Sequence, residues 1–382
     1  MRRPGAGLPG RPGPAGGPRI ALSGAPATAP AQGADKLLGI ELLRFVCACA
    51  VLLWHYQHFS YVANQAHQFE PARQPLYAAL GLFYRYGLYG VQVFWCISGF
   101  IFFWKYGAAI AGRHIGARRF FLLRLSRLYP LHLFTLLLVA ALQAVYFAGH
   151  QYYFVYRDNS PASFLLQLGL ASHWFYPLTG FSFNGPVWSI SLEVLAYLCF
   201  FLYTRRAGAG LPATAGAALA AGLAWRYCDW PLFECLLYFY LGALVALAGA
   251  RLATLGAPAR HGCNLAAAAL LATLPAWAPG PSTILLAGTP LLIHLLLQYV
   301  RPRRPALQRL LGGLGNLTYA SYLLHFPLQI VIALVCAAWG RAIPLYSPAL
   351  LAGFVALSFL LAHFCYHRLE MPLQRRLRAR FG

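Results

Sequence analysis

The sequence predicts an all-α fold, a polytopic membrane bundle of about ten transmembrane helices. Of the 382 residues, 60% are hydrophobic and only 10% are charged, whereas a soluble domain carries roughly 25% charged residues. The hydrophobic residues form long runs, and the breaks between these runs are short and contain Arg and Pro. Such a chain cannot cover a water-soluble globule with polar groups, so lipid is expected to surround most of its surface.

The chain is expected to have two parts. Residues 1–36 are rich in Gly, Pro and Ala and contain several arginines. Because this composition cannot bury a core, we expect a disordered cytoplasmic tail there. No short apolar stretch with a cleavage site precedes the first long apolar run, which is therefore expected to be an uncleaved anchor helix. The membrane domain is predicted over residues 37–375.

Ten apolar runs are predicted to span the membrane. Some of them are shorter than the ~20 residues that a spanning helix needs, and the fifth and seventh are rich in alanine. A further segment, 162–176, is predicted to be a re-entrant or interfacial helix. The predicted spans are 37–57, 88–106, 128–147, 187–204, 212–226, 231–250, 263–278, 283–300, 316–338 and 348–367.

The distribution of charge predicts the topology. If the N-terminus is cytoplasmic, 24 of the 30 Lys and Arg residues lie in cytoplasmic segments, as the positive-inside rule requires. Both termini are therefore predicted to be cytoplasmic. The formal net charge of +22 could indicate a nucleic-acid partner. However, the basic residues lie at the ends of apolar runs and not on a soluble module, so we predict no nucleic-acid partner.

The nine cysteines give no sign of a metal site. They are scattered, most lie inside apolar runs, and none forms a CxxC motif or a Cys/His cluster with zinc spacing. We interpret them as small buried apolar residues and predict no bound metal.

The longest predicted external segment, about 148–186, is rich in Tyr, Phe, Trp and His. Aromatic rings stack on the apolar faces of sugars, so this segment suits a sugar-like or lipid-linked acceptor. The alternative is an ordinary belt of interfacial aromatic residues.

The first predicted helix carries two ionisable residues on one face. Arg44 and His55 are eleven residues apart, which returns to nearly the same direction and separates them by ~16 Å along the axis. A buried arginine is costly, so Arg44 is expected to face protein or a water-filled cavity. His55 is a candidate general base. The alternatives are an Arg44–Glu41 structural pair or snorkelling, and a His55 bonded to a neighbouring carbonyl.

Two further motifs could contact a donor. Ser98 and Gly99 form a step that lets another backbone approach closely and leaves a hydroxyl facing it, and Ser98 is also a weak candidate nucleophile. Arg124 and Arg127 share a helical face, where paired guanidinium groups suit phosphate or pyrophosphate. Helix packing is the alternative for the first motif, and anchoring on anionic lipid is the alternative for the second.

Glu193 is the most unusual of the eight acidic residues, because it lies about two turns inside an apolar run. It is expected to pair with a cation, orient an imidazole or take part in proton transfer. The alternative is a structural salt bridge with an arginine of another helix. His325 and Glu370, in the last two predicted helices, are interpreted as structural support.

Taken in order, these motifs resemble the acyltransferase 3 family of integral membrane O-acyltransferases, over roughly residues 37–375. The resemblance implies ten spanning helices, an acyl-coenzyme A donor reached from the cytoplasm, and acylation of a hydroxyl. It also implies that Arg44 and His55 are needed for activity and that the Arg124-x-x-Arg127 pair lies at the donor. The motifs are Arg44-x10-His55, Ser98-Gly99-Phe100, Arg124-x-x-Arg127, Trp188-Ser189-x-Ser191-x-Glu193, Tyr319-x-x-Tyr322-x-x-His325-Phe-Pro327 and Glu370-x-Pro372.

The resulting hypothesis is an acyltransferase of the bacterial inner membrane, transferring groups other than aminoacyl groups. It would move an acyl group, expected to be acetyl, from acyl-coenzyme A to a hydroxyl of a cell-surface carbohydrate or glycoconjugate. His55 is expected to deprotonate the acceptor, and Glu193 to orient or charge-balance the site. The residues expected to contact donor or substrate are Arg44, Arg124, Arg127, Ser98 and Trp188. No bound cofactor is expected, and the partners are donor, acceptor and membrane lipid.

Three alternatives stay open at this point. The acyl group could pass directly through a tunnel along the first helix, or by way of a covalent intermediate on Ser98 or a histidine. A transporter or flippase of a lipid-linked glycan could use the same embedded charges as a proton or substrate path. A structural subunit that binds lipid is the third possibility, but it would not need a buried His and a buried Glu.

Overall fold

The computed structural model describes residues 37–381, and the tail predicted over 1–36 lies outside this range. Helices occupy all ten predicted spanning runs. Within the described range, eight helical segments are long and apolar enough to cross a membrane. The two that fall short are α8, with 17 residues, and α10, which are the alanine-rich pair. The all-α polytopic fold is therefore confirmed.

The helices follow one another with short connections and one small hairpin. The α-helices are α1 (Leu38–His55), α2 (Tyr77–Tyr86), α3 (Gly90–Phe102), α4 (Ala108–Ala111), α5 (Ala117–His150), α6 (Pro161–Leu168), α7 (Val187–Ala207), α8 (Leu211–Tyr227), α9 (Pro231–Leu252), α10 (Ala257–Trp277), α11 (Pro281–Tyr299), α12 (Pro305–Ala338), α13 (Pro348–Cys365) and α14 (Met371–Phe381). The 3-10 turns are η1 (Tyr56–Ser60), η2 (Pro71–Arg73) and η3 (Gly87–Tyr89), the π-helical turns are η4 (Phe103–Gly107) and η5 (Tyr366–Glu370), and the antiparallel hairpin is β1 (Tyr61–Val62) with β2 (Gln65–Ala66).

Several helices are longer than their apolar runs. Helix α5 begins at Ala117. The arginine-rich stretch that was predicted to be a cytoplasmic loop therefore forms the first turns of this helix. Helix α12 likewise begins at Pro305, before the predicted start at residue 316. The apolar pattern ends at the membrane boundary, but a helix continues past it because its backbone hydrogen bonds are internal. The segment predicted as re-entrant or interfacial holds only the eight-residue α6, followed by a loop.

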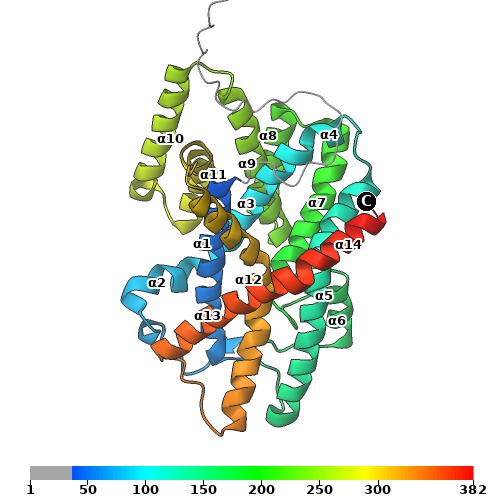
Figure 1. The fold of residues 1–382 in the computed structure, drawn as a ribbon, viewed down its shortest axis with the longest axis vertical. Coiled ribbons are helices and arrows are strands. Elements are labelled where there is room, and N and C mark those ends of the chain that lie inside the picture. Colours follow the sequence, from blue (N-terminus) through cyan, green and yellow to red (C-terminus); the bar gives the residue numbers. More distant parts are fainter. Residues whose placement is uncertain (1–36, 382) are drawn as a thin grey trace, which may run out of the picture.

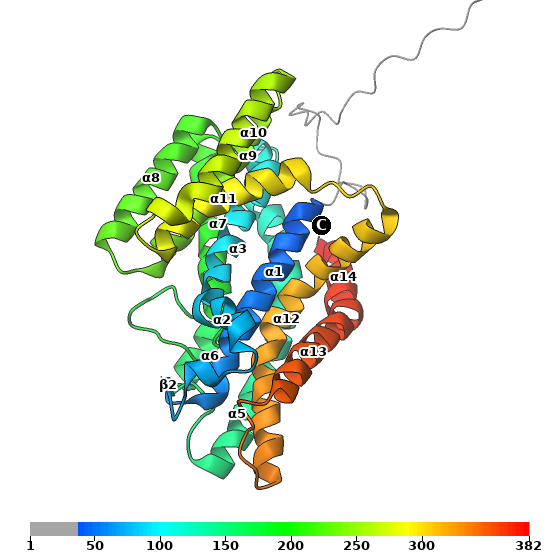
Figure 2. The same cartoon turned by 90° about the vertical axis from the view of Figure 1, so that its left-hand side faces the viewer.

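Helix α12 lies at the centre of the bundle, where α1, α5 and α13 pack against it (Figures 1 and 2). The ends of α5 and α12 that lead into loops 151–160 and 339–347 lie at one end of the bundle. The first residues of α1 and the end of α14 both lie in the opposite half of the bundle in both views. A chain that crosses a membrane an even number of times has both termini on the same side, which agrees with this arrangement.

Two clusters of buried apolar side chains fill the bundle. One is built largely on α3, α7 and α9 and contains Trp95, Phe200 and Phe239. The other lies around the end of α1 and the second half of α12, and contains Tyr56 and Phe326. Several side chains of the first cluster, among them Phe102 and Tyr197, also line the site described below.

Glycines allow the closest helix contact, between α3 and α9. A Cβ added at Gly99 would overlap the carbonyl oxygen of Phe239, and one added at Gly242 would overlap the carbonyl oxygen of Cys96. The two backbones therefore touch at two points. Because lipid tails are as apolar as Leu, helix association in a membrane depends on such close packing. The close approach expected from the Ser98-Gly99 step is thus present.

We expect Gly99→Leu and Gly242→Leu to separate α3 from α9 and to destabilise the protein. Overpacking of this kind costs roughly 1–3 kcal/mol, so the apparent melting temperature in detergent should fall by several degrees. Gly249→Leu is the matched control, because nothing lies within 4 Å of a Cβ added at that position of α9. Equal melting temperatures for Gly99→Leu and Gly249→Leu would contradict this account.

Candidate functional site

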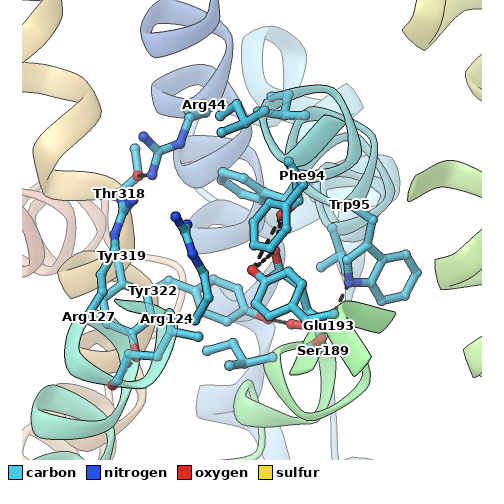
Figure 3. A pocket seen from close by; sticks show the side chains of 18 residues that line it. Arg44, Phe94, Trp95, Arg124, Arg127, Ser189, Glu193, Thr318, Tyr319 and Tyr322 are labelled. Carbon is cyan, nitrogen blue, oxygen red and sulfur yellow. Dashed lines mark hydrogen bonds between the residues drawn. The ribbon is translucent and has the colours of Figure 1, made fainter. Parts of the chain in front are cut away.

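A polar cavity of about 140 Å³ lies between five helices (Figure 3). Five of the seven residues that the sequence singles out line it: Arg44, Ser98, Arg124, Arg127 and Glu193. Figure 3 shows the arginines on one side of the cavity and Glu193 with Ser189 on the other. The lining comes from α1 (Arg44), α3 (Val91, Phe94, Trp95, Ile97, Ser98, Ile101, Phe102), α5 (Arg124, Arg127, Leu128), α7 (Ser189, Ile190, Glu193, Tyr197) and α12 (Thr318, Tyr319, Tyr322).

Arg44 is held by two partners while it lines the cavity. Its Nη1 donates to Glu41 Oε2 at 2.9 Å, and its Nη2 donates to Thr318 Oγ1 at 2.9 Å. Gly315 makes room for the Glu41 carboxylate, which a Cβ at that position would overlap. The Arg44–Glu41 pair considered from the sequence is therefore formed. It positions the guanidinium at the cavity, so pairing and a binding role are compatible.

Arg124 and Arg127 bring positive charge that no carboxylate neutralises directly. Neither arginine has a carboxylate oxygen within 4.0 Å among the described residues. The Arg124 guanidinium donates to the Tyr106 hydroxyl and stacks on the Phe102 ring, 4.6 Å from the ring centroid. These contacts fix its direction without cancelling its charge, which leaves a cationic surface suited to an anionic ligand.

Glu193 accepts hydrogen bonds from two hydroxyls and not from an arginine. Ser98 Oγ and Tyr197 OH both donate to its Oε1, the latter at 2.5 Å. Arg127 and Arg44 are close enough to interact with its charge through space. Tyr197 also stacks on Phe102, with ring centroids 4.2 Å apart. The sequence analysis missed Tyr197, although its i+4 spacing from Glu193 places both on one helical face.

Glu370 lies near the same cationic surface. Its side chain is buried in η5, its Oε2 has no hydrogen-bond partner among the described residues, and Arg127 and Arg44 interact with its charge. Glu370 is therefore close enough to Arg127 and Arg44 to interact with them electrostatically, although it does not line the cavity. This arrangement agrees with the supporting role expected from the sequence.

His55 lies outside the cavity, at the end of α1. Its imidazole is buried, its Nδ1 lies 2.8 Å from the Val51 carbonyl oxygen, and Gln329 donates to its own carbonyl oxygen. The rings of His58 and His325 lie beside it, with centroids 4.8 Å and 4.7 Å away. Arg44 and His55 thus occupy two separate polar regions on one helix. The sequence analysis did not foresee that His325 would contact His55.

Tyr322 separates the two regions. It lines the cavity, and its hydroxyl donates to the Pro186 carbonyl oxygen at 2.8 Å and is 2.7 Å from Ser189 Oγ. One turn further along α12, His325 lies with its ring centroid 6.0 Å from that of Tyr322. A single layer of two side chains on α12 therefore stands between the cavity and His55.

Trp188 does not line the cavity, in contrast to its neighbour Ser189. Its ring packs against Trp95, His173 and Phe181, at centroid distances of 5.7, 5.7 and 6.1 Å. Trp188 thus packs in this aromatic layer, whereas Ser189 and Ile190, which follow it on the helix, line the cavity. Burial within this aromatic layer lowers the pKa of His173 to about 4, because an imidazolium ion would be desolvated there.

The arrangement combines three chemical capabilities. The arginines can bind a multiply charged anion, Glu193 holds the Ser98 hydroxyl in a fixed direction, and His55 offers an imidazole for proton transfer. His55 and Ser98 are buried and the arginines and Glu193 are half-buried, so contact with bulk water is limited, which strengthens their electrostatic interactions.

Comparison with known families gives the chemistry a context. A family model described as an acyltransferase domain, acyltransferase 3, matches residues 37–363. Neither the curated proteins nor the solved structures compared with the chain gave a match. The family match covers most of the chain and includes α1 to α12 with most of α13. The chain therefore belongs to the acyltransferase 3 family and is a membrane acyltransferase that transfers groups other than aminoacyl groups.

Proposed function

We propose that the protein transfers an acetyl group from acetyl-coenzyme A to a hydroxyl of a cell-surface carbohydrate or glycoconjugate. The observation that carries the proposal is the pair of arginines, Arg124 and Arg127, that line the cavity without a carboxylate partner among the described residues. Coenzyme A carries a pyrophosphate and a third phosphate, and guanidinium groups bind phosphate oxygens through parallel hydrogen bonds. Arg44 then lies on the path of the thioester arm.

The size of the cavity supports a short acyl group. A space of about 140 Å³ resembles an engineered cavity of ~150 Å³ that holds one benzene molecule. It accommodates a thioester with a small acyl chain, while the nucleotide of coenzyme A remains at the mouth. Acetyl fits this limit and a long fatty acyl chain does not.

In the proposed reaction, His55 Nε2 accepts the proton of the acceptor hydroxyl as the oxygen attacks the thioester carbonyl. The Val51 carbonyl accepts a hydrogen bond from Nδ1, so Nε2 carries the lone pair in the neutral ring. Glu193 holds the Ser98 hydroxyl in place at the end of the cavity that would bind the donor. General-base assistance of this kind is typically worth 10²–10⁴-fold in rate.

A relay through Ser98 is the second route to the same product. The hydrogen bond from Ser98 Oγ to Glu193 gives the hydroxyl a carboxylate that could take its proton. An acyl-serine would then carry the group toward His55. Incubating the protein with acetyl-coenzyme A labelled in the acetyl group, without acceptor, separates the routes: covalent label that Ser98→Ala abolishes favours the relay, and its absence at saturating donor favours direct transfer.

The proposed topology places the donor on the cytoplasmic side of a bacterial inner membrane, with both termini cytoplasmic. The positive-inside distribution of 24 of the 30 Lys and Arg residues supports this orientation. The position of the α1 start and the α14 end in the same half of the bundle agrees with it. The rival function, a glycan transporter or flippase, has no comparable support, since the family match is to acyltransferases.

Arg127→Gln is expected to weaken the binding of coenzyme A about 10- to 100-fold. Hydrogen bonds to charged groups contribute about 1.5–3 kcal/mol each, which corresponds to this range of dissociation constants. Calorimetric titration of the purified protein in lipid nanodiscs measures the change. Arg118→Gln removes the same charge from an exposed position of α5 outside the cavity and should leave the affinity unchanged. Equal affinities for both variants would show that the phosphates bind elsewhere.

His55→Ala is expected to lower kcat about 10²- to 10⁴-fold and to leave the affinity for coenzyme A unchanged, because His55 lies outside the cavity. Release of free coenzyme A thiol from acetyl-coenzyme A, in proteoliposomes supplied with a panel of methyl glycosides, measures the rate. His294→Ala is the control, because His294 lies on α11 and forms a hydrogen bond with Asn264. A folded His55→Ala protein with full activity would disprove the assignment of the base.

A further inference from the structure

Three imidazoles gather at the end of α1 that leads into η1. His55 touches both of the others: its ring centroid is 4.8 Å from that of His58 in η1 and 4.7 Å from that of His325 in α12. All three side chains are buried, with exposed fractions of 3%, 4% and 1%. The trio does not have the arrangement of a metal site, because the described residues contain no group of three His, Cys, Asp or Glu side chains that could hold a metal ion.

The hydrogen bonds fix the tautomers of His55 and His325. The Nδ1 atom of His55 lies 2.8 Å from the Val51 carbonyl oxygen, and that of His325 lies 3.2 Å from the Ser321 carbonyl oxygen. A carbonyl oxygen can only accept, so each neutral ring carries its proton on Nδ1 and a lone pair on Nε2. The Nε2 atom of His325 is buried and has no partner among the described residues. Leaving a buried acceptor unpaired costs about 1–3 kcal/mol.

Among the described residues, no carboxylate or guanidinium interacts with the His55–His325 pair. The charged and titratable groups that interact with His325 and His58 are the other histidines of the trio, and no carboxylate or guanidinium is among them. Tyr322, on the same helix as His325, uses its hydroxyl for the Pro186 carbonyl and Ser189. Tyr156 and Tyr61 lie against His58. An imidazolium at His55 would therefore be stabilised by the Val51 carbonyl oxygen at Nδ1 and, at Nε2, by the lone pair of a neighbouring imidazole.

We propose that His325 is the positioning residue and proton partner of His55, an inference that rests on the acyl transfer proposed above. When the acceptor O–H bond breaks, the proton moves to His55 Nε2 and the oxygen electron pair forms the bond to the acyl carbon. The proton is then shared with His325 Nε2. As the C–S bond breaks, the departing sulfur takes this proton, which yields the coenzyme A thiol and returns both imidazoles to their neutral forms.

Substitutions at position 325 separate this role from simple packing. The site is buried among aromatic rings, so a packing role predicts that His325→Phe is tolerated better than His325→Gln. A proton-sharing role predicts the reverse order, because the Gln side chain still offers an acceptor oxygen. We expect His325→Phe to lower kcat about 10- to 100-fold, the range for losing a hydrogen bond to a charged group, and His325→Gln to lose less.

The experiment measures thiol release from acetyl-coenzyme A in proteoliposomes, with water or the best methyl glycoside as acceptor, between pH 5 and 9. Coenzyme A affinity is measured in parallel and should be unchanged in each folded variant. Without the acceptor on His325, an imidazolium at His55 is less stable, so the acid limb of the kcat/KM profile should move to lower pH. His294→Gln is the control for loss of a buried histidine elsewhere and should keep the wild-type profile.

The outcomes distinguish this inference from the proposed function. An inactive His55→Ala protein, together with His325→Phe at least as active as His325→Gln, overturns the inference alone. An unshifted acid limb in His325→Phe, or in His325→Leu where the Phe variant does not fold, overturns it as well. A wild-type protein that releases no thiol, or a His55→Ala protein of full activity, overturns the acyl transfer on which the inference rests.

Discussion

The desolvation of Arg44, Arg124 and Arg127 inside an apolar bundle is the constraint on which the rest of the site depends. An arginine at mid-membrane depth costs at least about 2.5 kcal/mol, and here the compensation comes from different sources. Arg44 has Glu41 and Thr318, whereas Arg124 has only a hydroxyl and aromatic rings. The bundle thus supports the guanidinium groups geometrically and leaves much of their charge for a ligand.

The same helices divide the polar interior into two regions. Helix α1 carries Arg44 to the cavity and His55 to the imidazole trio, while α12 carries Thr318 and Tyr322 to the first and His325 to the second. Contact between α1 and α12 therefore fixes the distance between the arginine-lined cavity and the imidazole trio. A donor that enters from one face and an acceptor that enters from the other could meet at the Tyr322–His325 layer. This division gives a physical reason for placing Arg and His eleven residues apart on one helix.

The sequence predicted those features that depend on one segment at a time. The apolar runs marked ten helices, and the burial cost of single charges pointed to Arg44 and Glu193, both of which line the cavity. Features that depend on packing between segments could not be predicted from the sequence. His325 was assigned to structural support because its contact with His55 joins residues 270 positions apart. Trp188 was assigned to the binding site because its motif, and not its side-chain direction, suggested it.

Tyr197 and the helical start of α5 are intermediate cases, since the sequence could have predicted each of them in part. The i+4 spacing from Glu193 could have identified Tyr197, since the hydrogen bond is local. The first turns of α5 were predicted to be a cytoplasmic loop, although the spacing of Arg124 and Arg127 already placed both on one helical face, and the contact of α5 with α14 was not predicted. Their helical form matters, because it sets Arg124 and Arg127 on one face toward the cavity.

The central claim is that this cavity binds the phosphates of the acyl donor through arginine. A cryo-electron microscopy structure of the protein in nanodiscs with coenzyme A tests it most directly. The account predicts phosphate density against Arg124 and Arg127, with the thiol end inside the cavity near Ser98 and Glu193. Density for coenzyme A at any other surface, with the cavity empty, would contradict it.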